Sequence, residues 1–263
     1  MSLKSSTSLK SETSSLKSAR ARRASQRAGH TAQKTLDRPF VLVNMAMTAD
    51  GKIATANRAV ASFGSARDHE HLLELRATAD AVMSGARTVD SAKINLGPGG
   101  SKYCQQRLRH GRAEYNLRII VSGSGSMDPQ AEVFKHKFSP IIILTTSKAS
   151  TSALRRLQTL ADEVKICGPT TIDFAAALRW LQQKWGVQRL LCEGGGDLND
   201  AMFRAGLVDE LHLTVCPKIF GGRNGQTISE GIGFPALTNA YPLRLKSARQ
   251  VNDEMYLVYE RIG

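Results

Sequence analysis

The stretch Leu190-Leu191-Cys192-Glu193-Gly194-Gly195-Gly196-Asp197-Leu198-Asn199 indicates how this chain folds. An apolar run meets a carboxylate and three glycines, and a segment with helical apolar spacing follows. This order predicts a strand, a tight turn and the start of a helix. Glycine lets the backbone approach a ligand closely, and the free amides of a helix start attract an anion such as a dinucleotide pyrophosphate. A plain strand–helix turn would use the same glycines.

Strands and helices alternate on both sides of this stretch. Apolar runs predict strands at 40–46, 81–83, 117–121, 140–144, 164–166 and 210–215. Capping residues and apolar spacing predict helices at 65–76 and 150–160, and a further helix from Thr170. Segments 243–248 and 255–259 alternate like antiparallel strands, and residues 90–116 read as a long polar loop. We therefore predict an α/β domain with a mixed, mostly parallel sheet, flanked by helices and ending in antiparallel strands.

Residues 1–37 have a composition unlike the rest. They are rich in Ser, Lys and Arg, and residues 1–38 hold more than half of the net charge of +13. Such a segment buries too little apolar surface to fold, so we predict a disordered tail at 1–37 and one domain at 38–263. Three roles stay open for the tail: a dispensable extension, an organellar transit peptide or a polyanion-binding arm. We expect a cytoplasmic protein, or an imported one if the tail is a transit peptide.

Several classes of partner are not expected. No apolar run approaches the roughly 18 residues of a membrane helix, and none of the standard nucleic-acid-binding motifs is present. His69 and His71 are two apart on a predicted helix and do not face together, so we predict no metal site. The four cysteines form no CxxC pair and suit buried free thiols in a reducing compartment. A moderately basic domain favours a small phosphorylated ligand.

Blocks of sequence in a fixed order resemble a known family. They are 43–54, 75–89, 193–199, 205–210 and 216–222. Together they resemble the reductase domain of riboflavin biosynthesis, the diaminohydroxyphosphoribosylamino-pyrimidine reductase family, whose fold is dihydrofolate-reductase-like. The likeness runs from about Arg38 to the C-terminus. It implies an NADPH-dependent reduction of a phosphoribosylamino-pyrimidine to its ribitylamino form, with hydride added to the ribose C1′, and it implies a homodimer.

The predicted NADPH site combines residue types with this resemblance. For the pyrophosphate we expect the three glycines and the backbone amides of two residues after them; the set is Gly194, Gly195, Gly196, Asp197 and Leu198. The Asp197 side chain is expected to cap the helix. The resemblance places Ala46 against the nicotinamide and Thr88 on the cofactor, although a helix cap would use Thr88 equally well. Hydroxyls and a cation at a strand end favour a 2′-phosphate, or form an ordinary capping loop; they are Thr146, Ser147 and Lys148.

Three residues are predicted to bind the substrate. The resemblance turns Arg76 toward the substrate, where its planar fork suits a 5′-phosphate; a solvated charge is the alternative. A carboxylate beside an apolar strand needs a partner, so Glu193 is expected to bind pyrimidine amino groups, or a backbone amide or structural arginine instead. Asn44 lies on the strand that would form the pocket floor. No residue is identified as the general acid.

The segment Thr88-Val-Asp-Ser-Ala-Lys-Ile-Asn-Leu-Gly-Pro-Gly99 departs from the family pattern. It lacks the paired Asp and the trailing Arg that relatives often carry there. Two alternatives therefore stay open: a reductase of the same fold acting on another pterin- or pyrimidine-like substrate, and a non-catalytic protein acting through its basic tail. The H-x-E…P-C-x-x-C signature of a zinc deaminase is absent from the sequence, so the reductase alone is expected.

Overall fold

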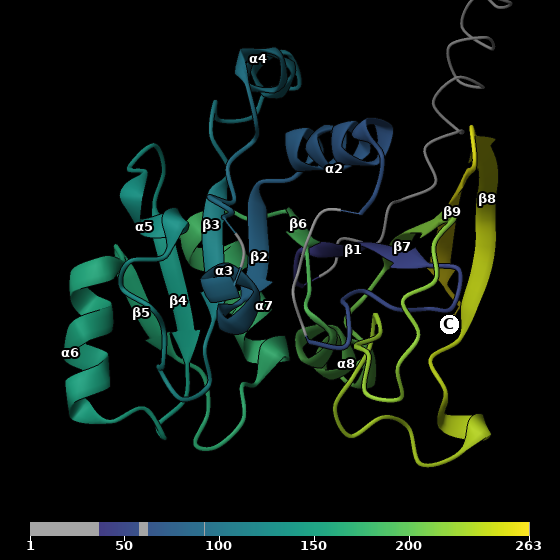
Figure 1. Cartoon of the computed structure of the whole chain (residues 1–263). Helices are drawn as coiled ribbons and strands as arrows, with labels where there is room; N and C mark the ends of the chain where they lie inside the picture. Colours follow the sequence, from purple (N-terminus) through teal and green to yellow (C-terminus); the bar gives the residue numbers. More distant parts are fainter. Residues whose placement is uncertain (1–36, 58–62, 92, 263) are drawn as a thin grey trace, which may run out of the picture. The chain divides into compact units, whose positions relative to one another are not determined.

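The computed structural model describes residues 37–57, 63–91 and 93–262 (Figure 1). Residues 1–36 of the predicted tail therefore lie outside the described residues. Within them, nine strands form one sheet in the order β5-β4-β3-β2-β6-β1-β7-β9-β8. The strands are β1 Phe40–Thr48, β2 Ala81–Gly85, β3 Leu117–Val121, β4 Ile141–Thr145, β5 Glu163–Ile166, β6 Arg189–Cys192, β7 Glu210–Cys216, β8 Leu243–Val251 and β9 Glu254–Arg261.

Strand direction confirms the predicted class of sheet. Every neighbouring pair from β5 across to β7 is parallel, whereas β9 pairs antiparallel with both β7 and β8. The parallel strands need crossover connections, and the helices between them supply these. The sheet is thus mixed, mostly parallel, and antiparallel only where the chain ends.

The helices are α2 Ala66–Thr78, α3 Ala86–Ser91, α4 Ser101–Arg109, α5 Glu132–Lys135, α6 Thr151–Leu160, α7 Phe174–Trp185 and α8 Gly196–Arg204, and a short 3-10 turn spans Leu237–Asn239. Ser65 and Ser150 cap α2 and α6 through their hydroxyls, as the sequence predicts. The helix expected from Thr170 begins later, because Asp173 caps α7. The expected loop at 90–116 was wrong in part, since α4 lies within it.

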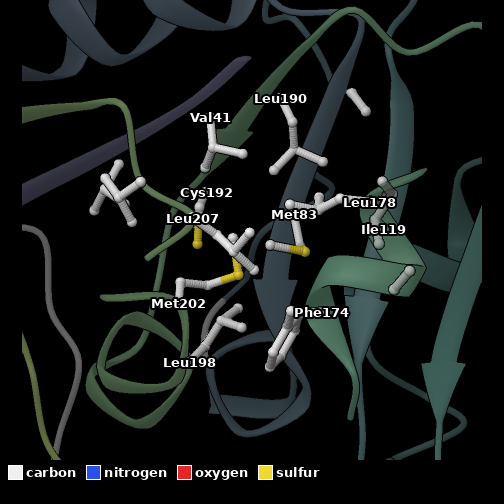
Figure 2. Close-up of a cluster of buried hydrophobic side chains, with 14 of the residues drawn as sticks. Val41, Met83, Ile119, Phe174, Leu178, Leu190, Cys192, Leu198, Met202 and Leu207 are labelled. Carbon is white, nitrogen blue, oxygen red and sulfur yellow. The ribbon is translucent and has the colours of Figure 1, made fainter. Parts of the chain in front are cut away.

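Two apolar layers hold the helices against the sheet, one on each face. Successive side chains of a strand point to opposite faces, so Val41 and Val43 join one layer and Leu42 the other. Figure 2 shows the first layer, where Phe174 of α7 and Met202 of α8 pack under the strands. The second layer takes Leu75 of α2 and residues of α3 and α6. The sheet is therefore buried on both faces where its strands are parallel, as is usual.

The carboxyl ends of β1, β2 and β6 lie together. β6 runs between the other two, pairing Val43 with Cys192 and Met83 with Cys192 in register. In open α/β sheets, ligands bind at the carboxyl ends of parallel strands. The glycine turn follows β6 directly, so this arrangement sets it at that edge of the sheet.

Candidate active site

A cavity of about 1270 Å³ opens at this edge. It draws its walls from the end of β1, one side of α2, the β2–α3 junction, the loop after β3, the start of α7 and the β6–α8 turn. Its lining includes these residues of the predicted site: Asn44, Ala46, Arg76, Thr88, Glu193, Gly195, Gly196, Asp197 and Leu198. Most of the predicted site is thus brought together, and a volume of this size suits a cofactor and a small substrate side by side.

Gly194 begins the glycine turn and fixes it to β2. Its φ of +77° is a backbone conformation that residues other than glycine rarely adopt. A Cβ at this position would lie 2.9 Å from the Met45 sulfur. The Gly194 carbonyl accepts hydrogen bonds from the Gly85 amide (2.8 Å) and the Ser84 hydroxyl (3.2 Å), and the Gly194–Gly195 peptide bond is cis. The turn is therefore positioned by strand β2 as well as by its own strand.

Thr88 also contacts the turn. It lies inside α3 rather than at a helix cap, so the capping alternative was wrong. Its hydroxyl accepts the Gly195 amide at 3.1 Å. On the other side, a Cβ at Gly196 would meet the Thr227 carbonyl at 2.8 Å, and the Glu230 amide donates to the Gly196 carbonyl at 2.9 Å. The backbone of the turn is thus held from two sides, which gives a rigid platform.

Helix α8 starts without a side-chain cap. Its N-cap is Gly195, and no side chain of the described residues bonds the first amides in the manner of a cap. The expected capping by Asp197 was wrong, because its carboxylate pairs instead with Arg87 across the cavity rim. Asp197 is half exposed in that pair. First-turn amides have no acceptor within a helix, so this end of α8 is open to an anion.

Arg76 and Glu193 form a buried pair. Arg76 Nε donates to Glu193 Oε1 at 2.6 Å and its Nη2 to Oε2 at 2.7 Å, while Nη1 donates to the Gly97 carbonyl at 2.7 Å. The side chains are only 8% and 10% exposed. A solvated Arg76 is thereby excluded, and the structural arginine considered as a partner for Glu193 is Arg76. Both residues line the cavity, so the pair presents a fixed, charge-balanced wall.

Asn44 places an unsatisfied oxygen in the cavity lining. The residue is 9% exposed, and its Oδ1 has no hydrogen-bond partner among the described residues. Ala46 lies two residues along β1, on the same face. A buried acceptor left unpaired costs about 1–3 kcal/mol, so such a group in a ligand cavity indicates that the ligand supplies the donor.

The segment predicted for the 2′-phosphate lies beside the cavity rather than in its lining. Thr146 is buried, and its hydroxyl donates to the Gly123 carbonyl at 2.6 Å, whereas Ser147 and Lys148 are exposed. The loop that it supports does line the cavity, through Ser122, Gly123, Ser124 and Ser126. The cluster Ser122-Gly-Ser-Gly-Ser126 after β3 was the signal for these residues. The role of 146–148 stays a prediction.

Asp68 is a further cavity residue that the sequence analysis missed. It is the third residue of α2, and it was read only as part of the helix start. Its carboxylate lines the cavity, and the Thr214 hydroxyl is hydrogen-bonded to it. Burial raises the pKa of this carboxyl above its usual range, and the Thr214 bond offsets part of the rise. The local sequence around Asp68 does not indicate a site residue, because the cavity is formed by segments that are distant along the chain.

Among the described residues, no group of three or more His, Cys, Asp or Glu side chains is placed to hold a metal ion. None of the helices described is both long and apolar enough to cross a bilayer. The four cysteines are free and buried.

The fold and its cavity define a dihydrofolate-reductase-like α/β protein with a ligand site at the carboxyl ends of its parallel strands. The chain belongs to the RibD C-terminal domain family, whose model matches residues 39–257. It is 31% identical to the 2,5-diamino-6-ribosylamino-4(3H)-pyrimidinone 5′-phosphate reductase of Methanothermobacter thermautotrophicus, over 84% of this chain and 98% of the relative. The family predicted from the sequence is thereby confirmed.

Solved structures agree on the fold. A pyrimidine reductase-like protein from Corynebacterium diphtheriae superposes with a TM-score of 0.70 at 22% identity, covering 89% of this chain and 96% of that one. RibD of Acinetobacter baumannii superposes with a TM-score of 0.66 at 16% identity, covering 86% of this chain. The present chain spans about 59% of the length of that RibD.

Proposed function

We propose that this chain is an NADPH-dependent reductase that converts a phosphoribosylamino-pyrimidine to its ribitylamino form in riboflavin biosynthesis. One observation carries the proposal: a single cavity joins an open helix start on a glycine turn to a buried arginine–carboxylate pair and an unpaired amide oxygen. The first part suits a dinucleotide, and the second suits a polar heterocycle with a phosphate. The name borne by the Methanothermobacter relative supports the same reaction.

The cofactor end of the cavity fits a nicotinamide dinucleotide. The amides of Asp197 and Leu198 would receive the pyrophosphate, and the tight approaches at Gly194 and Gly196 keep the turn in shape for it. The bound cofactor would supply the hydride. Ala46 would lie against the nicotinamide ring, and Thr88 would keep the Gly195 amide aligned through its 3.1 Å bond. The protein's contribution here is to position the ring and exclude water.

The substrate end uses Asn44, Arg76 and Glu193. Asn44 Oδ1 would accept from an amino group of the pyrimidine, which would satisfy its missing hydrogen bond. Glu193 keeps lone pairs beyond those used by Arg76, because each carboxylate oxygen can accept more than one bond. Arg76 remains the cation for the ribose 5′-phosphate. Arg76 already pairs with Glu193, and it would contact the phosphate as a second anion without changing its position.

The decisive experiment is a spectrophotometric assay of NADPH oxidation with the phosphoribosylamino-pyrimidine as substrate and dihydrofolate as control. We expect turnover with the first and none with the second. Turnover with dihydrofolate alone would favour the alternative of a different pterin-like substrate. No turnover with either would favour the non-catalytic alternative.

Selectivity for NADPH over NADH is a separate prediction. Lys148 is exposed in the loop after β4, next to the Thr146 hydroxyl that holds Gly123. If this cation meets the 2′-phosphate, Lys148→Ala should weaken NADPH binding about tenfold, as expected for a charged contact of about 1.5 kcal/mol, and leave NADH unchanged. Arg155→Ala, exposed on α6, is the matched control. Equal dissociation constants of the wild type for both cofactors would contradict the prediction.

We infer that the protein is a homodimer in a reducing compartment. The resemblance to the family favours a dimer, and β8 offers a sheet edge whose residues 244–250 are exposed. Free buried cysteines suit a cytoplasmic or organellar stromal environment. Light scattering after gel filtration tests the dimer, because a monomer mass at micromolar concentration would contradict it.

A further inference from the structure

One side of helix α2 lines the cavity along its length. Asp68, Leu72 and Arg76 recur every four residues, and all three belong to the lining. Eight residues of helix rise about 12 Å, so Asp68 and Arg76 mark two ends of one wall. Arg76 is held by Glu193 at the end where β6 meets the glycine turn. Asp68 therefore faces another part of the cavity, away from that pair.

Register places Asp68 beside the position expected for the nicotinamide. Its hydrogen-bond partner Thr214 lies on β7, and Thr214 is paired in register with Ala46 on β1. Residues paired in register on parallel strands share a face of the sheet, so Thr214 and Ala46 point to the same side. Asp68 comes down onto that side from α2. A proton on its carboxyl would thus lie next to the carbon that receives hydride.

The other carboxylates in and around the cavity are occupied. Both oxygens of Glu193 accept from Arg76, and Asp197 pairs with Arg87. Asp173 accepts the Ala176 amide as the cap of α7. Asp90 accepts the Asp128 amide at 3.1 Å, on the side of the loop after β3. Two of these cavity carboxylates thus pair with an arginine and two accept a backbone amide, whereas the Asp68 carboxylate has the neutral Thr214 hydroxyl as its partner.

The groups around Asp68 favour its protonated form. Glu254 on β9 raises its pKa through like charge, in addition to burial, while Thr214 and the neighbouring His69 lower it. Cys216 on β7 and Tyr256 on β9 also face it, and both have their own pKa raised to about 12, so they are neutral near pH 7. Glu254 is itself fixed by the Ser65 hydroxyl (2.6 Å) and the Tyr256 hydroxyl (2.8 Å).

We propose that Asp68 is the general acid of the reduction, a role that rests on the proposed function. The C1′–O4′ bond of the glycosylamine breaks as the nitrogen lone pair forms a C1′=N bond, and O4′ takes the proton of Asp68 to become the 4′-hydroxyl. C1′ then accepts the hydride of NADPH, and the C=N electron pair returns to nitrogen. Asp68 regains a proton from solvent. One NADPH and one proton are consumed for each ribitylamine formed.

The test compares Asp68→Asn with Glu70→Gln. The asparagine keeps the size of the side chain and can still bond Thr214, but it carries no acidic proton. The glutamine removes one carboxylate from the exposed side of the same helix, where Glu70 meets Arg67. General acid catalysis contributes about 10²–10⁴-fold, so we expect kcat of Asp68→Asn to fall at least a hundredfold. The NADPH dissociation constant should stay within twofold, and Glu70→Gln should match the wild type.

The pH profile is a second readout that a merely structural role would not produce. Wild-type kcat/KM should fall as pH rises through the pKa of Asp68, because the acid must be protonated; Asp68→Asn should lack that limb, and Asp68→Glu should keep it. Unchanged kcat and an unchanged profile in Asp68→Asn would overturn the role of Asp68 alone. If the wild type oxidises no NADPH with this substrate, the proposed function itself is overturned, and this separates the two failures.

Discussion

The Arg76–Glu193 pair joins residues 117 positions apart into one wall of the cavity. Two charges withdrawn from water gain most of their stability from each other, and removing one leaves the other buried without compensation. The sequence singles out each residue, because a carboxylate before a glycine turn and an arginine on a helix both call for a partner. It could not pair them, since local spacing holds no information about contacts between distant segments.

Breaking this pair should cost stability as well as substrate affinity. Arg76→Leu and Glu193→Leu should each lower the free energy of unfolding by about 3–5 kcal/mol. The double variant should lose less than the sum, because neither charge is left alone. Urea unfolding of the three variants gives the coupling energy directly. Strictly additive losses would show that the two side chains do not depend on each other.

At the scale of elements, helix α2 packs a polar row onto β7. His71 of α2 lies 3.3 Å from His212 of β7, whose other ring nitrogen lies 2.7 Å from Glu210. Burial, together with the charge of His212, lowers the pKa of His71 to about 4. The hydrogen bond from His212, together with Lys246, lowers the pKa of Glu210 to about 2. The two shifts act in different pH windows.

These pKa shifts predict how the stability of the folded chain depends on pH. Between pH 6.5 and about 4, His71 of the unfolded chain binds a proton that the folded chain does not, so stability falls as pH falls. The contribution of Glu210 is lost only lower, between about 4.5 and 2. The Tm of His71→Gln should therefore drop less than that of the wild type between pH 7 and 5. His110→Gln, exposed after α4, is the control; parallel curves for all three proteins would contradict the prediction.

The sequence predicted the strands and helices whose positions depend mainly on local residue patterns. Apolar runs placed the seven strands β1 to β7 to within a few residues, and alternating residues placed β8 and β9. Ser65 and Ser150 marked two helix starts. Helix α4 was missed because its sequence is mostly polar. Its buried Arg107 donates to the carbonyls of Arg76 and Ala79 at the end of α2. That helix is positioned by a tertiary contact, which periodicity does not report.

At the scale of the whole molecule, the family match and the two core layers lie within one domain. The match begins at residue 39, and the buried residues that form the layers run from Val41 to Leu213. A chain that begins at Asp37 should therefore keep the Tm and the NADPH kinetics of the full chain. Differential scanning calorimetry and the oxidation assay check this. A lower Tm would show that residues 1–36 stabilise the domain, and lost activity would favour a functional role for them.

The unpaired amide oxygen of Asn44 implies a trade-off between durability and recognition. This buried acceptor weakens the free protein and would gain a hydrogen-bond partner from a bound ligand. Asn44→Leu should thus raise the Tm of the free protein while it weakens substrate binding. Asn116 is the control: its Oδ1 is unpaired too, but its NH2 group donates to the carbonyls of Leu96 (2.8 Å) and Leu117 (3.0 Å), so Asn116→Leu removes two hydrogen bonds and should lower the Tm. If leucine lowered the Tm at both positions alike, Asn44 would be a structural residue rather than a binding residue. The trade-off between heat resistance and substrate binding would then not exist at this position.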